Sequence, residues 1–223
     1  MKAKFYHSIF HFIGEKFHIG FSMHGLFKGH TSSTKIALEL LLTASDTSDK
    51  YGFLDLMAKT NHQIAYIYYE TKQHTKAKEY SQKAYEQYLL LKDTVGIING
   101  FLTVADMDFE LGNKKAALEK GLACLEILEH IDITKNRILE RAYRIELGNI
   151  GTYYAGMNDF INAEHYLLRS INCCKATENK DYYFWLIELG KVYVSMHKYD
   201  AAEKVFLESF NYTNSVRNNG FWY

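Results

Sequence analysis

Small residues recur along this chain at two fixed spacings. A small residue is followed twelve residues later by an alanine, and seven residues after that by another small residue. The first small residues of the four copies are Ala65, Ala105, Gly151 and Gly190, which lie 40, 46 and 39 residues apart. A repeat at this period indicates an array of similar structural units rather than one irregular core.

The two spacings are typical of paired helices. Two antiparallel helices joined by a short turn approach closely only where small side chains face each other. The last small residue, seven positions further along the same face, allows the next unit to pack against the pair. One helix pair cannot bury its apolar face alone, so several pairs must stack to build a continuous core.

Composition also favours an almost entirely helical protein. The chain contains no proline, the residue that disfavours helix interiors most strongly. Its 26 basic and 26 acidic side chains balance, which argues against a general nucleic-acid binder, because such proteins carry surplus Lys and Arg. Cys124, Cys173 and Cys174 suggest no disulfide framework and favour a reducing compartment. We therefore expect a cytoplasmic protein, and no apolar run is long enough to predict a membrane span.

The third and fourth copies carry the most specific motif. The fourth runs from Leu189-Gly190 through Tyr193, Tyr199, Ala202 and Phe206. On these residues the chain resembles the tetratricopeptide repeat family, in the long-helix variety of bacterial signalling and peptide-sensing proteins. The resemblance implies an all-α fold, namely a right-handed superhelical solenoid of antiparallel helix pairs. The second copy departs from the motif, with Asp108 in place of an aromatic and Gly121 in place of a bulky residue.

The chain is expected to have two parts. Residues 1–30, rich in His and Phe, are expected to be a leader or capping segment. Residues 31–223 are expected to form the repeat domain, with about four full repeats after a partial one whose second helix is residues 34–44. The other expected helices are 51–71, 75–92, 95–111, 114–130, 135–155, 160–177, 180–196 and 199–217. Asp93, Asn113 and Asn158-Asp159 provide turn and cap chemistry between them.

The resemblance also implies where a ligand would bind. In this family the first helix of each repeat lines a concave groove, at positions six and three before and one and four after the first small residue. These positions and their neighbours hold aromatics, amides and charges, which suit an extended peptide. The candidate groove residues are Lys59, His62, Tyr66, Tyr69, Asn99, Thr103, Asp106, Phe109, Ile145, Asn149, Phe184, Glu188 and Lys191, and Gly148 is a further lining position.

A non-catalytic scaffold that binds a protein or peptide segment, with no cofactor, is therefore the leading hypothesis. The first alternative is a peptide- or ligand-sensing regulatory domain of a bacterial signalling protein. The second is a metal-binding protein that uses His7, His11, His18, His24 and His30. A chaperone adaptor is not expected, because the family's carboxylate clamp of Lys, Arg and two Asn has no match at His62, Tyr66, Thr103, Ile145 and Asn149.

The last repeat suggests a homodimer through an end of the array. Its second helix is expected to leave Tyr199, Val205 and Phe206 on an exposed face. An apolar patch of this kind is seldom left bare on a monomer. A second copy is the favoured cover, and a fold-back of Phe221-Trp222-Tyr223 or a longer native chain are the alternatives. We expect neither a membrane nor nucleic acid as a direct partner.

Overall fold

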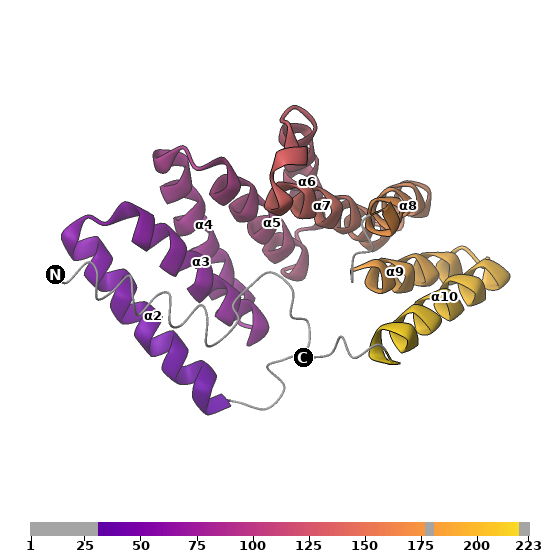
Figure 1. The fold of residues 1–223 in the computed structure, drawn as a ribbon, viewed down its shortest axis with the longest axis horizontal. Coiled ribbons are helices and arrows are strands. Elements are labelled where there is room, and N and C mark those ends of the chain that lie inside the picture. Colours follow the sequence, from indigo (N-terminus) through magenta and orange to yellow (C-terminus); the bar gives the residue numbers. More distant parts are fainter. Residues whose placement is uncertain (1–30, 177–180, 219–223) are drawn as a thin grey trace. The chain divides into compact units, whose positions relative to one another are not determined.

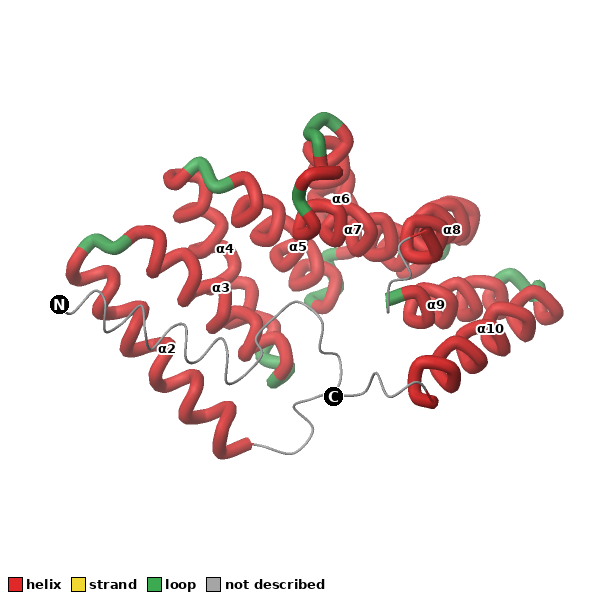
Figure 2. The backbone as a smooth tube through the Cα atoms, viewed as in Figure 1, coloured by secondary structure: helices red, strands yellow, loops and turns green. Residues whose placement is uncertain are grey.

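The computed structural model describes residues 31–176 and 181–218, which are helical apart from short connections (Figure 1 and Figure 2). No strand occurs within these residues, so the predicted all-α class is confirmed. The elements in chain order are α2 (Thr31–Tyr51), α3 (Leu54–Glu70), α4 (His74–Leu91), α5 (Thr94–Glu110), α6 (Lys114–Glu129), the 3-10 turn η1 (Ile133–Lys135), α7 (Arg137–Gly156), α8 (Phe160–Ala176), α9 (Tyr182–Ser195) and α10 (Tyr199–Asn218).

The helix bounds follow the expectations closely from residue 51 onward. Each of the eight helices expected there is present, with both ends within three residues of the expected position. The helix expected at 34–44 is longer, because α2 begins at Thr31 and continues to Tyr51. The spacing of 46 before the third repeat arises from a seven-residue connection, 130–136, that contains η1, and from an α7 of 20 residues.

Turn residues end and begin the helices largely as expected. The Asp93 carboxylate accepts hydrogen bonds from the Val95 and Gly96 amides, which caps α5. Asp159 does the same for α8 through the Asn162 amide, at 3.2 Å. Asn158 adopts a left-handed φ of 63°, which closes the preceding helix. Asn113 lies in the turn before α6, as expected, but its side chain makes no capping hydrogen bond.

The described helices form two compact units, which divide after Leu111. The first contains α2 to α5, and the second contains α6 to α10. Within them, α3 packs against α4, α7 against α8, and α9 against α10. These contacts between chain neighbours are the pairs that the first, third and fourth copies predict, whereas α5 and α6, which the second copy would pair, fall in different units.

The predicted small residues all lie on the buried sides of their helices. The residues that begin, continue and end the four copies are all buried: Ala65, Ala77, Ala84, Ala105, Ala117, Cys124, Gly151, Ala163, Ser170, Gly190, Ala202 and Ser209. At Gly151 the approach is between backbones, since a β-carbon there would lie 3.1 Å from the Leu167 nitrogen and 3.2 Å from the Ala163 oxygen. Any larger side chain would force the two helices apart.

A second spacing, of 26 residues, joins the first helix of a repeat to its second. The Ser170 hydroxyl donates to the Arg144 carbonyl at 2.8 Å, and the Ser209 hydroxyl donates to the Tyr183 carbonyl at 3.0 Å. Both pairs are 26 residues apart and occupy equivalent positions in successive repeats. At these sites serine is small enough to allow close helix packing, as alanine does elsewhere. Its hydroxyl also forms a hydrogen bond with the facing helix.

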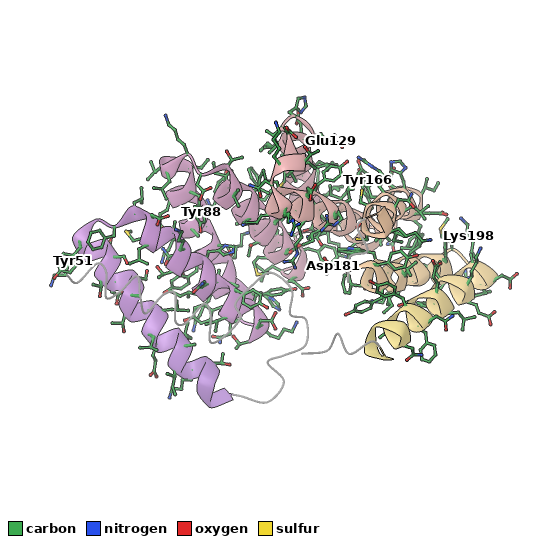
Figure 3. The ribbon with its side chains drawn as sticks, viewed as in Figure 1. Tyr51, Tyr88, Glu129, Tyr166, Asp181 and Lys198 are labelled. Atoms are coloured by element: carbon green, nitrogen blue, oxygen red, sulfur yellow. The ribbon has the colours of Figure 1, made fainter. Side chains whose placement is uncertain are left out.

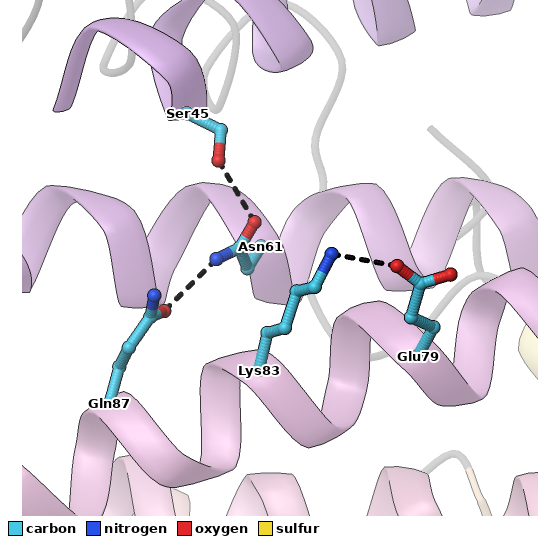
Figure 4. A network of polar contacts seen from close by, with 5 residues as sticks. All are labelled: Ser45, Asn61, Glu79, Lys83 and Gln87. Carbon is cyan, nitrogen blue, oxygen red and sulfur yellow. Dashed lines mark hydrogen bonds and ion pairs between the residues drawn. The ribbon is translucent and has the colours of Figure 1, made fainter. Parts of the chain in front are cut away.

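A buried amide ties α2 into the first unit (Figure 4). Asn61 on α3 is 4% exposed and accepts a hydrogen bond from Ser45 of α2 at 3.0 Å. Its amide nitrogen donates to Gln87 of α4 at 3.0 Å. One side chain thus bonds to both neighbouring helices, and fixes the register of α2 as well as that of α4.

The departures of the second repeat from the family motif have local compensations. Asp108, in the place of an aromatic, is 1% exposed and forms an ion pair with Lys78 of α4. Gly121, in the place of a bulky residue, leaves room for α7, because a β-carbon there would lie 2.7 Å from a Glu146 carboxylate oxygen and 3.2 Å from the Tyr153 ring.

The outer face of α10 differs from the expectation. Tyr199 is 61% exposed as predicted, but Val205 and Phe206 are partly buried, and that part of the prediction is wrong. The reason is helical register, which turns Phe206 toward Ala202 so that its ring lies over Gly190. Leu207 and Phe210 are exposed instead, at 53% and 62%.

Two further expectations concern the cysteines and the chain ends. Cys174 is fully buried and Cys173 partly exposed, as two neighbours on one helix should be. The five N-terminal histidines, and Phe221, Trp222 and Tyr223, lie outside the described residues.

Candidate binding surface on the first helices

The candidate residues of α3 follow one exposed stripe of the helix. Lys59, His62, Tyr66 and Tyr69 recur every three or four residues, which places them on one face, and each is partly exposed. The opposite face packs into the unit, where Ile64 and Ala65 are fully buried. The same helix therefore supplies both the core and an accessible row of aromatic and basic groups.

The candidate residues of α5 form a second row in the same unit. Asn99, Thr103, Asp106 and Phe109 are partly exposed, whereas the intervening Leu102, Val104 and Ala105 are buried. The Thr103 hydroxyl donates to the Asn99 carbonyl at 2.8 Å, so this threonine is already bonded within its own helix. The Asn99 and Asp106 side chains leave an amide and a carboxylate on this row.

One end of the α3 row lies near carboxylates of α5. Burial raises the pKa of Tyr69, and the nearby carboxylates of Asp106 and Glu110 on α5 raise it further. Glu110 also lies 3.9 Å from the imidazole of His74, whose ring contacts Tyr69 edge to face. Tyr69 thus stands among carboxylates at this end of the first unit.

His62 has a strongly shifted titration. Burial lowers its pKa from 6.5 to about 4, so that the imidazole is neutral at physiological pH. Its ring meets Tyr88 of α4 edge to face, with centroids 6.4 Å apart. Figure 3 labels Tyr88, which reaches from α4 toward α5, where a β-carbon on Gly96 would lie 2.1 Å from its ring. His62 is therefore more a packing group of the first unit than a charged one.

The second unit carries its own candidate residues on α7 and α9. Ile145 and Asn149 of α7, and Phe184 and Glu188 of α9, are partly exposed, while Lys191 is exposed. Lys191 donates to the Glu188 carboxylate at 2.6 Å, which neutralises both groups locally.

Gly148 is a lining position in the sequence pattern but a packing position in the structure. Trp185 of α9 lies over it, and Trp185 is 4% exposed. The Phe184 and Trp185 rings meet edge to face, with centroids 4.7 Å apart. Phe184 is thereby held rigidly at the surface by its buried neighbour.

Sequence reasoning missed Gln63, Glu70 and Glu110. Gln63 is 9% exposed, and its amide oxygen is buried without a hydrogen-bond partner among the described residues. It stands two residues before Ala65, as Thr103, Asn149 and Glu188 stand two before the small residues of their own repeats. That shared offset was the signal that would have identified it. Nothing local marked Glu70 and Glu110, whose relevance comes from the position of Tyr69.

The described part of the chain offers no evident metal or membrane site. No group of three or more His, Cys, Asp or Glu side chains there is placed to hold a metal ion. None of the helices in 31–176 and 181–218 has both the length and the apolarity needed to cross a bilayer.

Comparison with known proteins agrees with this architecture. Residues 58–88 match the family model of the tetratricopeptide repeat. The apo form of RapI is similar, with a TM-score of 0.71 and 17% identity over 95% of this chain and 73% of that one. A Rap protein complexed with competence and sporulation factor has a TM-score of 0.70 and 15% identity, over 84% of this chain and 51% of that one.

NprR in complex with its cognate peptide NprX is a further similar structure, with a TM-score of 0.64 and 20% identity over 80% of this chain and 50% of that one. This chain therefore spans about half the length of the protein chain in each of these two peptide complexes. At these identities the similarity shows the fold alone. Comparison with curated protein sequences finds no match.

Proposed function

We propose that this chain, in which residues 58–88 form a tetratricopeptide repeat, is a non-catalytic scaffold that binds an extended peptide or protein segment along its first helices. The observation that carries the proposal is the pair of partly exposed rows on α3 and α5. Their side chains alternate with fully buried ones, so the surface is accessible but rigidly held. Pre-formed surfaces of this kind bind without an ordering cost of their own.

The chemistry of the rows suits a peptide. Tyr66, Tyr69 and Phe109 offer apolar area for ligand side chains, and aromatic residues dominate such contacts. The Asn99 amide can donate to and accept from a peptide backbone. All three cysteines are thiols, which fits the proposed cytoplasmic location.

The carboxylates near Tyr69 favour a ligand with a basic side chain. Glu70, Asp106 and Glu110 each act on this tyrosine, and an aromatic face beside carboxylates attracts a cation. Lys72 of this chain lies over the Tyr69 ring, with its Nζ 5.6 Å from the centroid, and we expect a Lys or Arg of the ligand to take this place where it meets α3 and α5. Its contribution should weaken as salt is added.

The test begins with a library of random unstructured peptides, selected on the full chain and measured by calorimetry. Tyr66→Ala combined with Phe109→Ala should weaken a selected peptide more than tenfold. Tyr199→Ala and Leu90→Ala, at exposed positions on α10 and α4, are matched controls that should bind normally. Circular dichroism must show that every variant is folded. Equal binding by the double variant and the wild type would show that the surface is elsewhere.

A second candidate function is a peptide-sensing regulatory domain. The observation that favours it is the similarity in fold to NprR in complex with its cognate peptide and to a Rap protein complexed with competence and sporulation factor. In repeat proteins each unit contacts only its neighbours, so a ligand that prefers one arrangement shifts the population toward it. Small-angle scattering of the full chain with and without a selected peptide tests this. An unchanged radius of gyration at saturation would favour the plain scaffold.

A further inference from the structure

Two side chains of the second unit are buried with hydrogen-bond donors that find no acceptor. Arg144 of α7 is 8% exposed, and its Nε–H has no partner within the part of the chain that the structure describes. Trp185 of α9 is 4% exposed, and the same holds for its indole N–H. Buried donors are nearly always hydrogen-bonded, and a buried guanidinium is especially costly without an acceptor. The position of these two donors therefore indicates where an acceptor would bind.

The two donors lie on facing stripes of α7 and α9, which contact each other. Arg141, Arg144 and Gly148 follow one side of α7 at intervals of three and four residues, and Asp181 and Trp185 are one turn apart at the start of α9 (Asp181 is labelled in Figure 3). The Arg141 Nε lies 4.0 Å from an Asp181 carboxylate oxygen. The indole carbon Cε2, which is bonded to the indole nitrogen, would lie 2.5 Å from a β-carbon at residue 148. On α7, Arg144 stands between these two contacts.

The charge of Arg144 acts on the helix beneath these stripes. Burial raises the pKa of Cys174 on α8 to about 11, the Asp181 carboxylate raises it as well, and the Arg144 guanidinium lowers it. Cys174 and Trp185 belong to the same apolar cluster. The Ser170 hydroxyl donates to the Arg144 carbonyl at 2.8 Å, which holds this part of α7 against α8. Arg144, Asp181 and Trp185 therefore all lie near the same buried thiol.

The charges on the two stripes favour an acceptor with a single negative charge. Arg141 and Arg144 carry two positive charges, and Asp181 carries one negative charge. The Arg141 and Asp181 side chains are 26% and 25% exposed and form a rim, whereas Arg144 is buried. The positive end of the α9 dipole lies at the same place.

A carboxylate has the required charge and shape. It is planar, and its two oxygens accept from two donors at once, which matches a guanidinium N–H beside an indole N–H. It would also neutralise the remaining positive charge of the two stripes. A phosphate dianion would leave a net negative charge among buried groups, which is unfavourable.

We propose that the second unit binds a carboxylate between α7 and α9, where the Arg144 guanidinium and the Trp185 indole N–H donate to its two oxygens. Arg141 and Asp181 form the partly exposed rim of this site. The site goes beyond the proposed peptide-binding surface and does not depend on it, because a free organic acid and an acidic group of a peptide present the same carboxylate.

The indole N–H of Trp185 reports on the site directly. Trp222→Phe leaves Trp185 as the only tryptophan of the chain, so that the nitrogen-15-labelled protein gives one indole signal. Sodium acetate at pH 7, titrated against sodium chloride at equal ionic strength, should shift this signal saturably. Acetamide, which has the shape of acetate without its charge, should bind at least tenfold more weakly. A signal that responds equally to acetate and chloride would overturn the proposal, as would tighter binding of inorganic phosphate than of acetate.

Substitutions in the same background test the donor. Arg144→Met should weaken acetate binding at least tenfold, and Arg144→Lys, which keeps the charge but not the Nε–H, at least threefold. Arg137→Met, at an exposed position on the same helix, is the matched control and should bind normally. Circular dichroism must show that each variant is folded, and Arg144→Lys decides if Arg144→Met is not. Equal affinity in the Arg144 variants and the control would overturn the proposal. Binding by Asp181→Asn alone would also overturn it, because Asp181 would then be the acceptor in the native chain.

Competition experiments distinguish the two sources of the carboxylate. If a peptide carries it, a selected peptide should displace acetate, and the same peptide with every carboxyl group amidated should do so at least tenfold more weakly. If neither form displaces acetate, the site takes a free acid, and the proposal is supported by the acetate titration alone. If no peptide binds the chain at all, the proposed function fails, and the acetate titration still decides whether the site exists.

Discussion

The indole ring of Trp185 lies directly on Gly148, so that a β-carbon at residue 148 would lie 2.5 Å from three atoms of that ring. The contact joins α9 to α7 in the second unit, and it buries the largest side chain of the fourth repeat. Glycine is required there for packing, not for backbone conformation, because residue 148 is in the middle of a helix.

Gly148→Ala should therefore destabilise the protein, although alanine is the better helix former. Overpacking costs about 1–3 kcal/mol and exceeds the roughly 0.5–1 kcal/mol gained in helix propensity, so we expect a net loss of about 1–2 kcal/mol in urea unfolding. In a Trp185→Leu background the smaller side chain leaves room for the new methyl group. An equal loss in both backgrounds would show that the tryptophan contact is not the cause.

The ion pair between Lys78 and Asp108 should stabilise the folded protein, and a double-mutant cycle measures by how much. Lys78→Met removes the cation next to a carboxylate whose side chain is 2% exposed, and should cost about 1–3 kcal/mol. Combined with Asp108→Leu, which removes the buried charge, the same substitution should cost much less. Additive losses in the two single variants and the double variant would mean that the residues do not interact.

Acidification should weaken the fold through His62. The imidazole takes up a proton near pH 6.5 in the unfolded chain but only near pH 4 in the folded one, so the unfolded state binds more protons between these values. The contribution of neutral His62 to the free energy of unfolding is therefore fully present above pH 6.5. It falls by up to about 3 kcal/mol as the pH drops to 4.

The measurement compares unfolding of the wild type, His62→Gln and His165→Gln at pH 7 and pH 4. His165 is exposed on α8 and serves as the control. The wild type and the control should lose more stability than His62→Gln over this interval. Identical pH dependence in all three proteins would contradict the assignment.

Alkylation should distinguish Cys173 from the other two thiols. Cys124 and Cys174 are fully buried, and burial raises the pKa of Cys174 to about 11. Burial and the nearby Glu146 raise the pKa of Cys124 as well. Because the thiolate is the nucleophile, iodoacetamide at pH 8 should label Cys173 at least tenfold faster, as read by peptide mass spectrometry. Cys173→Ser should abolish the fast phase, and equal rates at all three sites would refute the prediction.

The exposed stripe of α10 predicts self-association. Tyr199, Leu207 and Phe210 lie along one side of this helix and are more than half exposed. Light scattering should show a concentration-dependent dimer, which Leu207→Glu with Phe210→Glu converts to a monomer of 25.9 kDa. Leu90→Glu, at a position 73% exposed on α4, is the control and should leave the dimer intact. A monomeric wild type at high micromolar concentration would end this prediction.

The sequence by itself determined the helices and the pairing of α3 with α4, α7 with α8, and α9 with α10. Ala65, Ala77 and Ala84 and their counterparts mark where helices touch, because only small side chains allow that approach, and the positions can be read from spacing alone. The resemblance to the repeat family, and not the spacing, gave the candidate positions that include Tyr66 and Phe109. Their partial exposure follows from helical periodicity once the buried side is known.

The tertiary structure alone decided what those residues meet. The burial of Phe206 on Gly190, the cover of Trp185 on Gly148, and the carboxylates around Tyr69 all join side chains from different helices. Spacing determines which face of a helix a residue occupies. It does not determine which side-chain rotamer of the neighbouring helix packs against that residue, or which charged group lies near it. Those outcomes depend on how closely two helices approach, and that distance is set by all the side chains between them at once.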